Sequence, residues 1–524
     1  MLLLLSLAHA DTLSWRLEQL TRIDDPAERF RHARLRPEPR PDPDFATVVV
    51  EVDVWADPRQ VAADALALSP DITLEASARD LLQLRVPVDS LQFLAALGGV
   101  ARVREPDLPS SKAIVTEGKD EIFVNDWHQS GVTGEGVLVG VLDVTFGGLD
   151  QVLGSELPDT VGTTPASLGG VNTHGTAVAE IVHDIAPGAD LHLYQFSTEV
   201  EFYERCDQMV QDGVEVVNAS IGFDNTWHAD GTSPYTETVE LVVDNGVTWV
   251  AAAGNEVGRY FIGPIAEDSD GWVTIDGELY VPIQNTATET SVSLRWSEPM
   301  DAAGVDLDLY LFDEDFEGCS YSAEVQDGDD RPYEWAACDV GGSVLYAAVA
   351  VSSGDPTGLT AYLYAPAFLA DSSWDVAEST LTLPADAESA ITVGAYELDT
   401  LEIAGFSSQG PTDDGRMKPD VVAPSGVSTS SMGVVFDGTS AAAPHVAGVA
   451  ALIRERTYGS PSEIKQVILN QADDFGAEGP DNVYGHGATR TRKLPEPWCG
   501  CNSAIGGGGA WLFAMLLAWR RRSS

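Results

Sequence analysis

Largely apolar runs of residues recur through the middle and the C-terminal third of the chain. They occupy residues 136–143, 213–220, 247–253 and 390–394. Such runs are typical of parallel strands that are covered on both faces. Apolar helical patterns accompany them at 174–185, 439–453 and 461–470. Together they predict an α/β unit with helices packed on a parallel sheet.

The N-terminal part has a different and more varied pattern. We expect strands at 47–54, 82–88 and 100–103 and helices at 58–68 and 89–97, which is a small α+β domain. A polar linker that contains several prolines precedes it within residues 11–45. The polar stretch 106–112 (PDLPSSK) follows it and is suited to cleavage, because exposed polar segments are the usual sites of proteolytic nicking.

Short alternating strands interrupt the α/β unit. Residues 265–384 contain strand patterns at 272–275, 292–296, 305–312, 344–351 and 360–364, separated by turns such as Asp327-Gly328. Closely spaced short strands predict a β-sandwich or jelly roll. The α/β unit is therefore expected in two pieces, 113–264 and 385–490.

Polar residues stand where these elements begin and end. Asp143 closes an apolar run, Asn255 follows another, and His174 and Ser440 open apolar helices. Parallel sheets gather functional groups at the carboxyl ends of their strands, and helix N-termini offer unpaired N–H donors. We expect Pro444 to be tolerated in the first turn of its helix. His445, five residues after Ser440, should point away from Ser440 and serve the fold.

Four motifs in this order resemble the subtilisin-type (S8) serine peptidases: VGVLD at 139–143, THGTAVAEI at 173–181, AAAGN at 251–255 and GTSAAAPHVAG at 438–448. FSSQGP at 406–411 and KPDVVAP at 418–424 strengthen the resemblance, which covers about 134–470 apart from the insertion. It implies a three-layer α/β fold with a parallel sheet and helices on both faces. The preceding α+β domain then resembles an inhibitory propeptide, and the insertion resembles jelly-roll modules of exported relatives.

The resemblance also implies roles for individual residues. Ser440 would be the nucleophile, His174 its base and Asp143 the partner that orients the base. Asn255 and the Ser440 N–H would hold the oxyanion. The substrate would add as a strand, with these binding residues: Ser220, Ile221, Gly222, Ala253 and Gly254. One departure is that Val144 and Thr145 follow Asp143, where many relatives have Thr-Gly or Ser-Gly.

These roles describe a serine endopeptidase that acts on protein or peptide substrates through an acyl-enzyme, with its own propeptide as an intramolecular inhibitor and no cofactor required for the chemistry. A catalytically silent surface protein that binds through the β-module is the alternative. An α/β-hydrolase lipase is excluded, because that class has the order Ser…Asp…His, whereas here the order is Asp143…His174…Ser440.

Charge and cysteines refine this picture. The chain has 82 acidic and 29 basic residues, for a net charge of −53. This argues against nucleic-acid binding, which needs a basic footprint, and suits an exported protein. Acidic stretches at 313–317 and 327–330 could hold structural Ca²⁺, but solvation explains them more simply, so we assign no metal ligands. Cys319 and Cys338 are a candidate disulfide, and Cys206 is expected to be buried.

Both ends of the chain carry targeting patterns. Residues 1–10 (MLLLLSLAHA) resemble a shortened signal peptide, or alternatively form a core strand. Within 491–524, the apolar segment 504–519 precedes Arg520-Arg521-Arg522 and resembles the sorting tails of myxobacterial surface proteins. As a helix it would span about 24 Å, short of a bilayer core of about 30 Å. These features predict an extracellular or cell-surface protein anchored in the membrane through its tail.

Overall fold

The computed structural model describes residues 12–14, 17, 21–22, 45–106, 110–111, 118–269, 271–284, 290–338, 344–367, 369, 376–432 and 435–496. The predicted signal segment 1–10 and the apolar tail segment 504–519 lie outside these residues. Within the described part, no helix has both the length and the apolar character needed to cross a bilayer.

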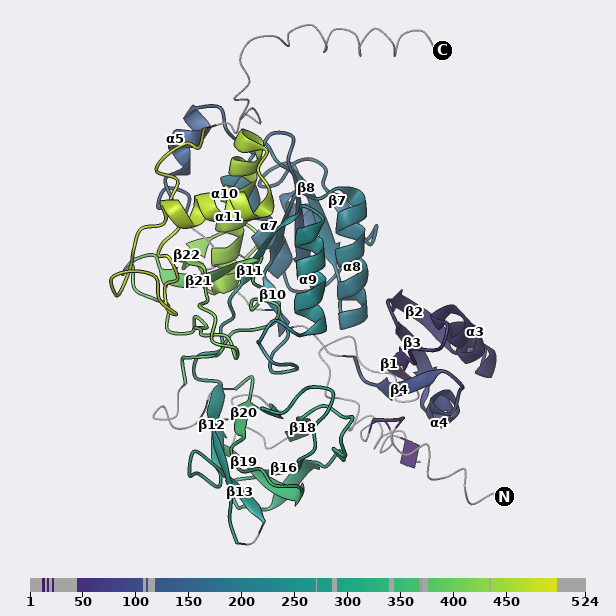
Figure 1. Ribbon diagram of the computed structural model, residues 1–524. Helices are drawn as coiled ribbons and strands as arrows, with labels where there is room; N and C mark the ends of the chain where they lie inside the picture. The colour runs from purple at the N-terminus through teal and green to yellow at the C-terminus, as the bar shows by residue number, and fades with distance from the viewer. Residues whose placement is uncertain are drawn as a thin grey trace, which may run out of the picture.

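A seven-stranded sheet, in which every pairing is parallel, lies within the helix-rich unit in the upper part of Figure 1. Its order is β22-β21-β11-β9-β6-β8-β7. The strands are β6 (Leu138–Asp143), β7 (Gly162–Thr164), β8 (Asp190–Gln195), β9 (Val216–Ala219), β11 (Thr248–Ala252), β21 (Ile391–Glu397) and β22 (Val421–Ser425). The expected runs at 136–143, 213–220, 247–253 and 390–394 each supply one of them.

Helices cover both faces of this sheet, which gives the predicted three layers. One face carries α7 (His174–Ile185), α10 (Thr439–Thr457) and α11 (Pro461–Gln471), and the other carries α8 (Glu199–Asp212) and α9 (Pro234–Asp244). Side chains of β6 alternate between the layers, because Val139 and Val141 pack with the first group and Leu142 with the second. Continuous apolar strands are needed because both faces are buried. The predicted fold class is thus confirmed.

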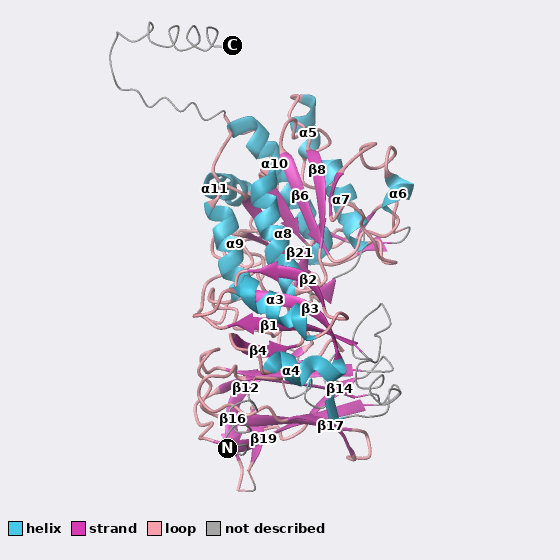
Figure 2. Ribbon diagram, turned by 90° about the vertical axis from the view of Figure 1, so that its right-hand side faces the viewer, coloured by secondary structure: helices cyan, strands magenta, loops and turns pink. Residues whose placement is uncertain are grey.

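A four-stranded antiparallel sheet of order β2-β3-β1-β4 forms the N-terminal unit. Its elements are β1 (Phe45–Val52), α3 (Pro58–Leu68), β2 (Thr73–Ala78), β3 (Leu81–Pro87), α4 (Leu91–Ala95) and β4 (Val100–Arg104). The sequence pattern did not predict β2, because only Ala76 and Ala78 of its six residues are buried. Figures 1 and 2 place this unit beside the junction of the other two.

Nine antiparallel strands form a second sheet between Tyr260 and Tyr364. They are β12 (Tyr260–Glu267), β13 (Trp272–Ile275), β14 (Val281–Gln284), β15 (Thr290–Trp296), β16 (Asp306–Phe312), β17 (Gly318–Ser322), β18 (Tyr333–Cys338), β19 (Val344–Ser353) and β20 (Thr360–Tyr364). Both halves of this sheet contribute to one hydrophobic core. The first strand begins five residues before the predicted boundary at 265, because Gly263 and Pro264 break the alternating pattern within β12.

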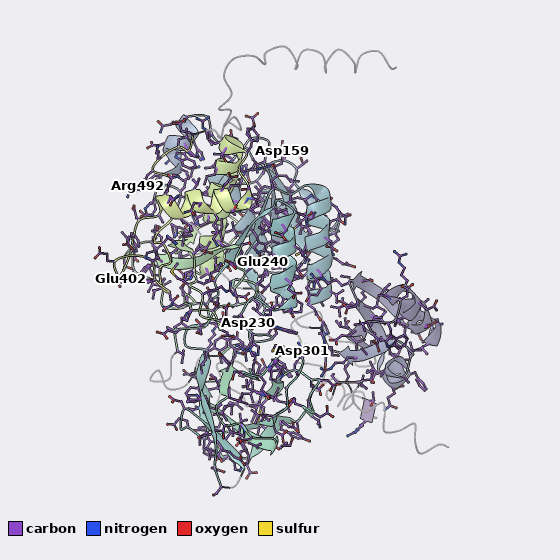
Figure 3. The ribbon with its side chains drawn as sticks, viewed as in Figure 1. Asp159, Asp230, Glu240, Asp301, Glu402 and Arg492 are labelled. Carbon is purple, nitrogen blue, oxygen red and sulfur yellow. A yellow bond between two sulfur atoms is a disulfide. The ribbon has the colours of Figure 1, made fainter. Side chains whose placement is uncertain are left out.

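Short elements complete the described chain: the 3₁₀ turn η1 (Val88–Ser90), α5 (Val124–Gln129), α6 (Leu149–Val152) and the two-residue strands β5 (Ser110–Ser111), β10 (Ile221–Gly222), β23 (Val427–Ser428) and β24 (Val435–Phe436). Carboxylates are spread over the outside, as the exposed side chains of Asp159, Asp301 and Glu402 show (Figure 3).

The crossing of α10 over α7 requires a residue without a side chain. A Cβ added to Gly448 of α10 would lie 2.5 Å from the Cβ of Ile185 in α7. We expect Gly448→Ala to lower the free energy of unfolding by about 1–3 kcal/mol, because overpacking forces the helices apart. Urea unfolding in a Ser440→Ala background, which removes the expected nucleophile, measures the change.

Gly405→Ala is the matched control, because a Cβ there would meet no atom within 4 Å. Its unfolding free energy should stay within about 0.5 kcal/mol of the parent. Equal midpoints for the two variants would contradict the proposed close approach of α7 and α10.

Candidate active site

Asp143 and His174 meet at the carboxyl end of the parallel sheet. Asp143 is the last residue of β6, and His174 is the first residue of α7. His174 Nδ1 donates to Asp143 Oδ2 at 2.6 Å, and both side chains are fully buried. The other carboxylate oxygen, Oδ1, accepts the N–H groups of Val144 (2.8 Å) and Thr145 (3.2 Å). The unusual residues after Asp143 therefore hold its carboxylate through their backbone.

Gly175 allows this contact. A Cβ at position 175 would lie 2.5 Å from the Thr145 carbonyl oxygen and 2.7 Å from the Asp143 Cβ. A side chain there would push α7 away from β6 and separate His174 from Asp143. Gly175 thus serves a tight contact inside the protein.

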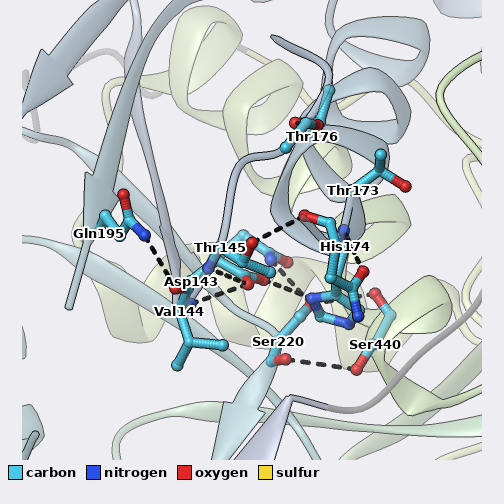
Figure 4. A network of polar contacts seen from close by, with 12 residues as sticks. Asp143, Val144, Thr145, Thr173, His174, Thr176, Gln195, Ser220 and Ser440 are labelled. Atoms are coloured by element: carbon cyan, nitrogen blue, oxygen red, sulfur yellow. Dashed lines mark hydrogen bonds and ion pairs between the residues drawn. The ribbon is translucent and has the colours of Figure 1, made fainter. Parts of the chain in front are cut away.

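Ser440 approaches the same place from the second residue of α10. Its Oγ donates to the main-chain carbonyl of Ser220 at 3.3 Å, and Ser220 Oγ donates to the Ser440 carbonyl at 3.0 Å. Asn218 Nδ2 in turn donates to Ser220 Oγ at 2.9 Å. Figure 4 shows the His174 ring between the Asp143 carboxylate and Ser440. Three residues that lie far apart in the sequence are thus brought to one point.

Pro444 has a role different from the one expected. The helix begins at Thr439, so Pro444 lies in its second turn and removes the N–H that would bond to the carbonyl of residue 440. Ser220 Oγ takes that place as donor to the Ser440 carbonyl. The proline thereby leaves the turn that bears Ser440 open to a contact from the neighbouring strand.

Asn255 faces the start of the same helix. Its Oδ1 accepts from the Thr439 N–H at 2.9 Å and from Thr439 Oγ at 3.0 Å. With the oxygen held there, the Nδ2 group of the same amide must point to the opposite side. Sequence reasoning missed Thr439, although its place directly before Ser440 could have suggested it. The amide is oriented by that threonine.

The predicted substrate strand is already paired with another part of the chain. Ile221 and Gly222 of β10 pair antiparallel with Ser111 and Ser110 of β5. The segment that follows the N-terminal unit thus occupies the edge expected for an extended peptide. Ser220, the next residue along this edge, is the one that contacts Ser440.

Ala253 and Gly254 contribute differently. The Ala253 N–H bonds to the Val393 carbonyl and its own carbonyl to the Thr382 N–H. The Gly254 N–H donates to Thr439 Oγ at 3.1 Å, and its carbonyl accepts from the Ser408 N–H. All four peptide groups are satisfied within the protein. These two residues therefore hold the backbone that leads into Asn255, and their assignment to substrate binding stays a prediction.

His445 lies on the other side of α10, as its spacing predicted. Its Nδ1 donates to the Ala441 carbonyl at 2.8 Å, and the ring lines a cavity of about 430 Å³ beside Gly118 and Asp184. Burial lowers the pKa of His445 to about 4. The folded protein therefore keeps this ring neutral at pH values at which an unfolded chain would protonate it.

The pKa of His445 predicts acid sensitivity. Between an ordinary histidine pKa of about 6.5 and the folded value of about 4, the unfolded state binds a proton that the folded state does not, so stability falls as pH falls. On the Ser440→Ala background, His445→Gln should reduce the loss of unfolding free energy between about pH 7 and pH 5 by about 2 kcal/mol. Urea titrations at both pH values test this; identical losses with and without His445 would rule the cause out.

The disulfide and the acidic loops lie in the nine-stranded unit, whereas Cys206 lies in the α/β unit. A disulfide joins Cys319 of β17 to Cys338 of β18, with their Cα atoms 6.0 Å apart. Cys206 is fully buried in α8, and burial raises the pKa of its thiol. Asp313 accepts N–H groups of Asp315 and Glu317 within its own turn. Carboxylates of Asp327, Asp329 and Asp330 come within 4.8 Å of one another, a geometry that solvated acids also adopt.

Comparison with known proteins agrees with this arrangement. The model of the Subtilase family, Peptidase_S8, matches residues 134–293 and 324–487, which is more than half of the chain. The chain is 34% identical over 140 residues to the serine protease AprX of Bacillus subtilis, a match that covers 22% of this chain and 31% of AprX. It is 46% identical over 113 residues to pyrolysin of Pyrococcus furiosus, covering 18% of this chain and 8% of pyrolysin.

Longer but weaker likenesses extend over more of the chain. The subtilisin-like protease SBT1.2 of Arabidopsis thaliana is 23% identical over 417 residues, covering 64% of this chain and half of that protein. The solved structure of the Clostridium perfringens CspB protease matches with a TM-score of 0.50 and 17% identity, over 71% of this chain and 97% of that one. At this identity the structural likeness supports the fold. The curated relatives AprX and pyrolysin are matched over less than a third of their own lengths.

Proposed function

This chain belongs to the Subtilase family, and we propose that it is a serine endopeptidase whose catalytic residues are Asp143, His174 and Ser440. The observation that carries the proposal is the buried bond between His174 Nδ1 and Asp143 Oδ2 at 2.6 Å, with Ser440 next to the ring. A serine hydroxyl is a weak nucleophile unless a base removes its proton as it attacks. His174 supplies that base at this site.

The reaction follows from these positions. Ser440 Oγ attacks the peptide carbonyl while His174 Nε2 takes the hydroxyl proton, and Asp143 stabilises the resulting imidazolium. Asn255 Nδ2 and the Ser440 N–H hold the oxyanion, because Thr439 fixes the amide and the first-turn N–H groups of a helix have no intrahelical partner. His174 then protonates the leaving amine, and water resolves the acyl-enzyme. These steps need only the residues of this chain.

The N-terminal unit is proposed to be an inhibitory propeptide. Pairing of β5 with β10 supports this, because residues 110–111 lie where a substrate strand would add. Arg104 of β4 binds Glu199 of α8 at 2.6 Å, so the unit is also held by the surface of the α/β unit. We assign residues 11–112 to the propeptide, 113–264 and 385–490 to the peptidase, 265–384 to the inserted unit, 1–10 to a signal peptide and 491–524 to a linker and anchoring tail.

The substrates are protein or peptide chains that bind in extended form. Export is supported by the disulfide, since such bonds persist in oxidising compartments. It is also supported by a relative named extracellular serine protease, from Serratia marcescens, which is 48% identical over 56 residues.

Replacement of the nucleophile tests the proposal. Ser440→Ala should abolish peptide hydrolysis and leave the precursor uncut, whereas the parent should mature with a new N-terminus close after Ser111. Casein hydrolysis, N-terminal sequencing and labelling with a fluorophosphonate measure the three effects. A matched Ser462→Ala variant, changed on the exposed start of α11, should behave as the parent. Undiminished hydrolysis by Ser440→Ala would contradict the assignment of Ser440 as the nucleophile. A parent that the fluorophosphonate does not label would favour a catalytically silent binding protein.

The oxyanion assignment has its own test. Loss of one such donor lowers kcat about 100- to 1,000-fold in subtilisin, the model for this effect, and we expect a similar loss for Asn255→Ala. KM should change little, because the donor acts on charge that develops in the transition state. Steady-state kinetics on a chromogenic peptide measure kcat and KM separately. A rise in KM at constant kcat would show that Asn255 only binds substrate.

A further inference from the structure

The inserted unit begins directly after the loop that contains Asn255. Its first strand, β12, starts at Tyr260, five residues after Asn255, and pairs with its last strand, β20. In that pairing Tyr260 lies opposite Tyr364, and their rings are 4.9 Å apart. Both tyrosines are buried. The last strand of the inserted unit therefore brings Tyr364 back beside Tyr260, where the inserted unit begins.

The Tyr364 hydroxyl bonds to a carboxylate beside the oxyanion residue. It donates to Glu256 Oε2 at 2.8 Å, and the Glu256 side chain is fully buried. The other oxygen, Glu256 Oε1, accepts the main-chain N–H of Asn255 at 2.9 Å. One carboxylate thus links the inserted unit to the backbone of Asn255.

The same hydroxyl also contacts the loop that follows the predicted substrate strand. It lies 3.1 Å from Oδ2 of Asp224, two residues after Gly222 of the substrate strand. The side chain of Asn225 reinforces this junction, since its Nδ2 donates to Ser293 Oγ at 3.0 Å and to the Tyr362 carbonyl at 3.0 Å. Tyr364 therefore ties the loop of Asn255 to the end of the substrate strand.

We propose that Tyr364 is a positioning residue for the oxyanion hole, and that the inserted unit acts in catalysis by holding Asn255 through Glu256. This inference rests on the proposed peptidase function. The Asn255 side chain is fixed by Thr439, but its backbone depends on the loop 254–257, to which Glu256 gives a buried anchor. Oxyanion donors work only when held at the right distance, and a displacement of about 1 Å can cost on the order of 100-fold in rate.

Tyr364→Phe removes the hydroxyl and keeps the ring. We expect kcat to fall about tenfold per active site titrated with fluorophosphonate, with KM within about twofold of the parent, because the effect is on the transition state. A peptide aldehyde, whose adduct with Ser440 places an oxyanion at Asn255, should bind about tenfold more weakly. Tyr310→Phe is the matched control: its hydroxyl also donates to a carboxylate, Asp308 Oδ2 at 3.1 Å, on another strand of the same unit. It should keep the parent kinetics.

A double-mutant cycle distinguishes an effect of Tyr364 on the position of Asn255 from a general loss of rigidity. If Tyr364 acts through Asn255, Tyr364→Phe should change kcat by less than about twofold in the Asn255→Ala background. An equal loss in both backgrounds, or a loss no greater than that of Tyr310→Phe, overturns the inference. If Tyr364→Phe fails to fold, Glu256→Gln replaces it in the same double-mutant cycle, and the results are judged by the same criteria. An active parent with an unaffected Tyr364→Phe rejects only this inference, whereas an inactive, unlabelled parent rejects the peptidase assignment.

Discussion

The close contact of α7 with the loop after β6 is the constraint on which the active site depends. Because Gly175 has no side chain, the first turn of α7 can lie against the backbone of residues 143–145, and His174 reaches the buried Asp143 carboxylate. A second close contact, Gly448 against Ile185, then sets α10 on α7 and brings Ser440 to the same point. Small residues at these two places decide the geometry, since neither helix could approach with a larger side chain.

The sequence predicted the parts of the site that depend on local pattern. Asp143, His174, Asn255 and Ser440 each stand at the end of a strand or the start of a helix, so their elements could be predicted from the neighbouring residues. The parallel sheet covered on both faces followed from the apolar runs for the same reason, whereas the three-layer fold was implied by the resemblance to the family. The strand β2 was missed because its solvent-facing side chains hide the alternation.

Contacts between distant segments could not be predicted in this way. The bond of Thr439 to Asn255 joins residues 184 positions apart, and that of Ser220 to the Ser440 carbonyl joins residues 220 apart. The expectation for Pro444 was wrong because Pro444 is the sixth residue of a helix that starts at Thr439, and so lies beyond its first turn. Tyr364 carries no motif at all. Its relevance appears only when β20 pairs with β12.

Several of the few basic side chains of this acidic chain form ion pairs between its units. Arg104 pairs with Glu51 and Glu199, each at 2.6 Å, and Arg102 binds Glu324 of the nine-stranded unit at 2.9 Å. Arg295 of β15 holds Asp413 of the α/β unit at 3.0 Å. With 82 acidic residues, units that approached without such pairs would repel one another.

The two-residue ladder between β5 and β10 bears on how long self-inhibition could last. If the N-terminal unit is the propeptide proposed above, β5 of the continuous chain competes for the substrate edge at an effective concentration on the order of millimolar. Once the chain is cut, the same segment competes only at the concentration of the free fragment. Dilution of the fragment would then favour its exchange for other peptides, so that the volume around the protein, as well as the cut itself, would govern release from this inhibition.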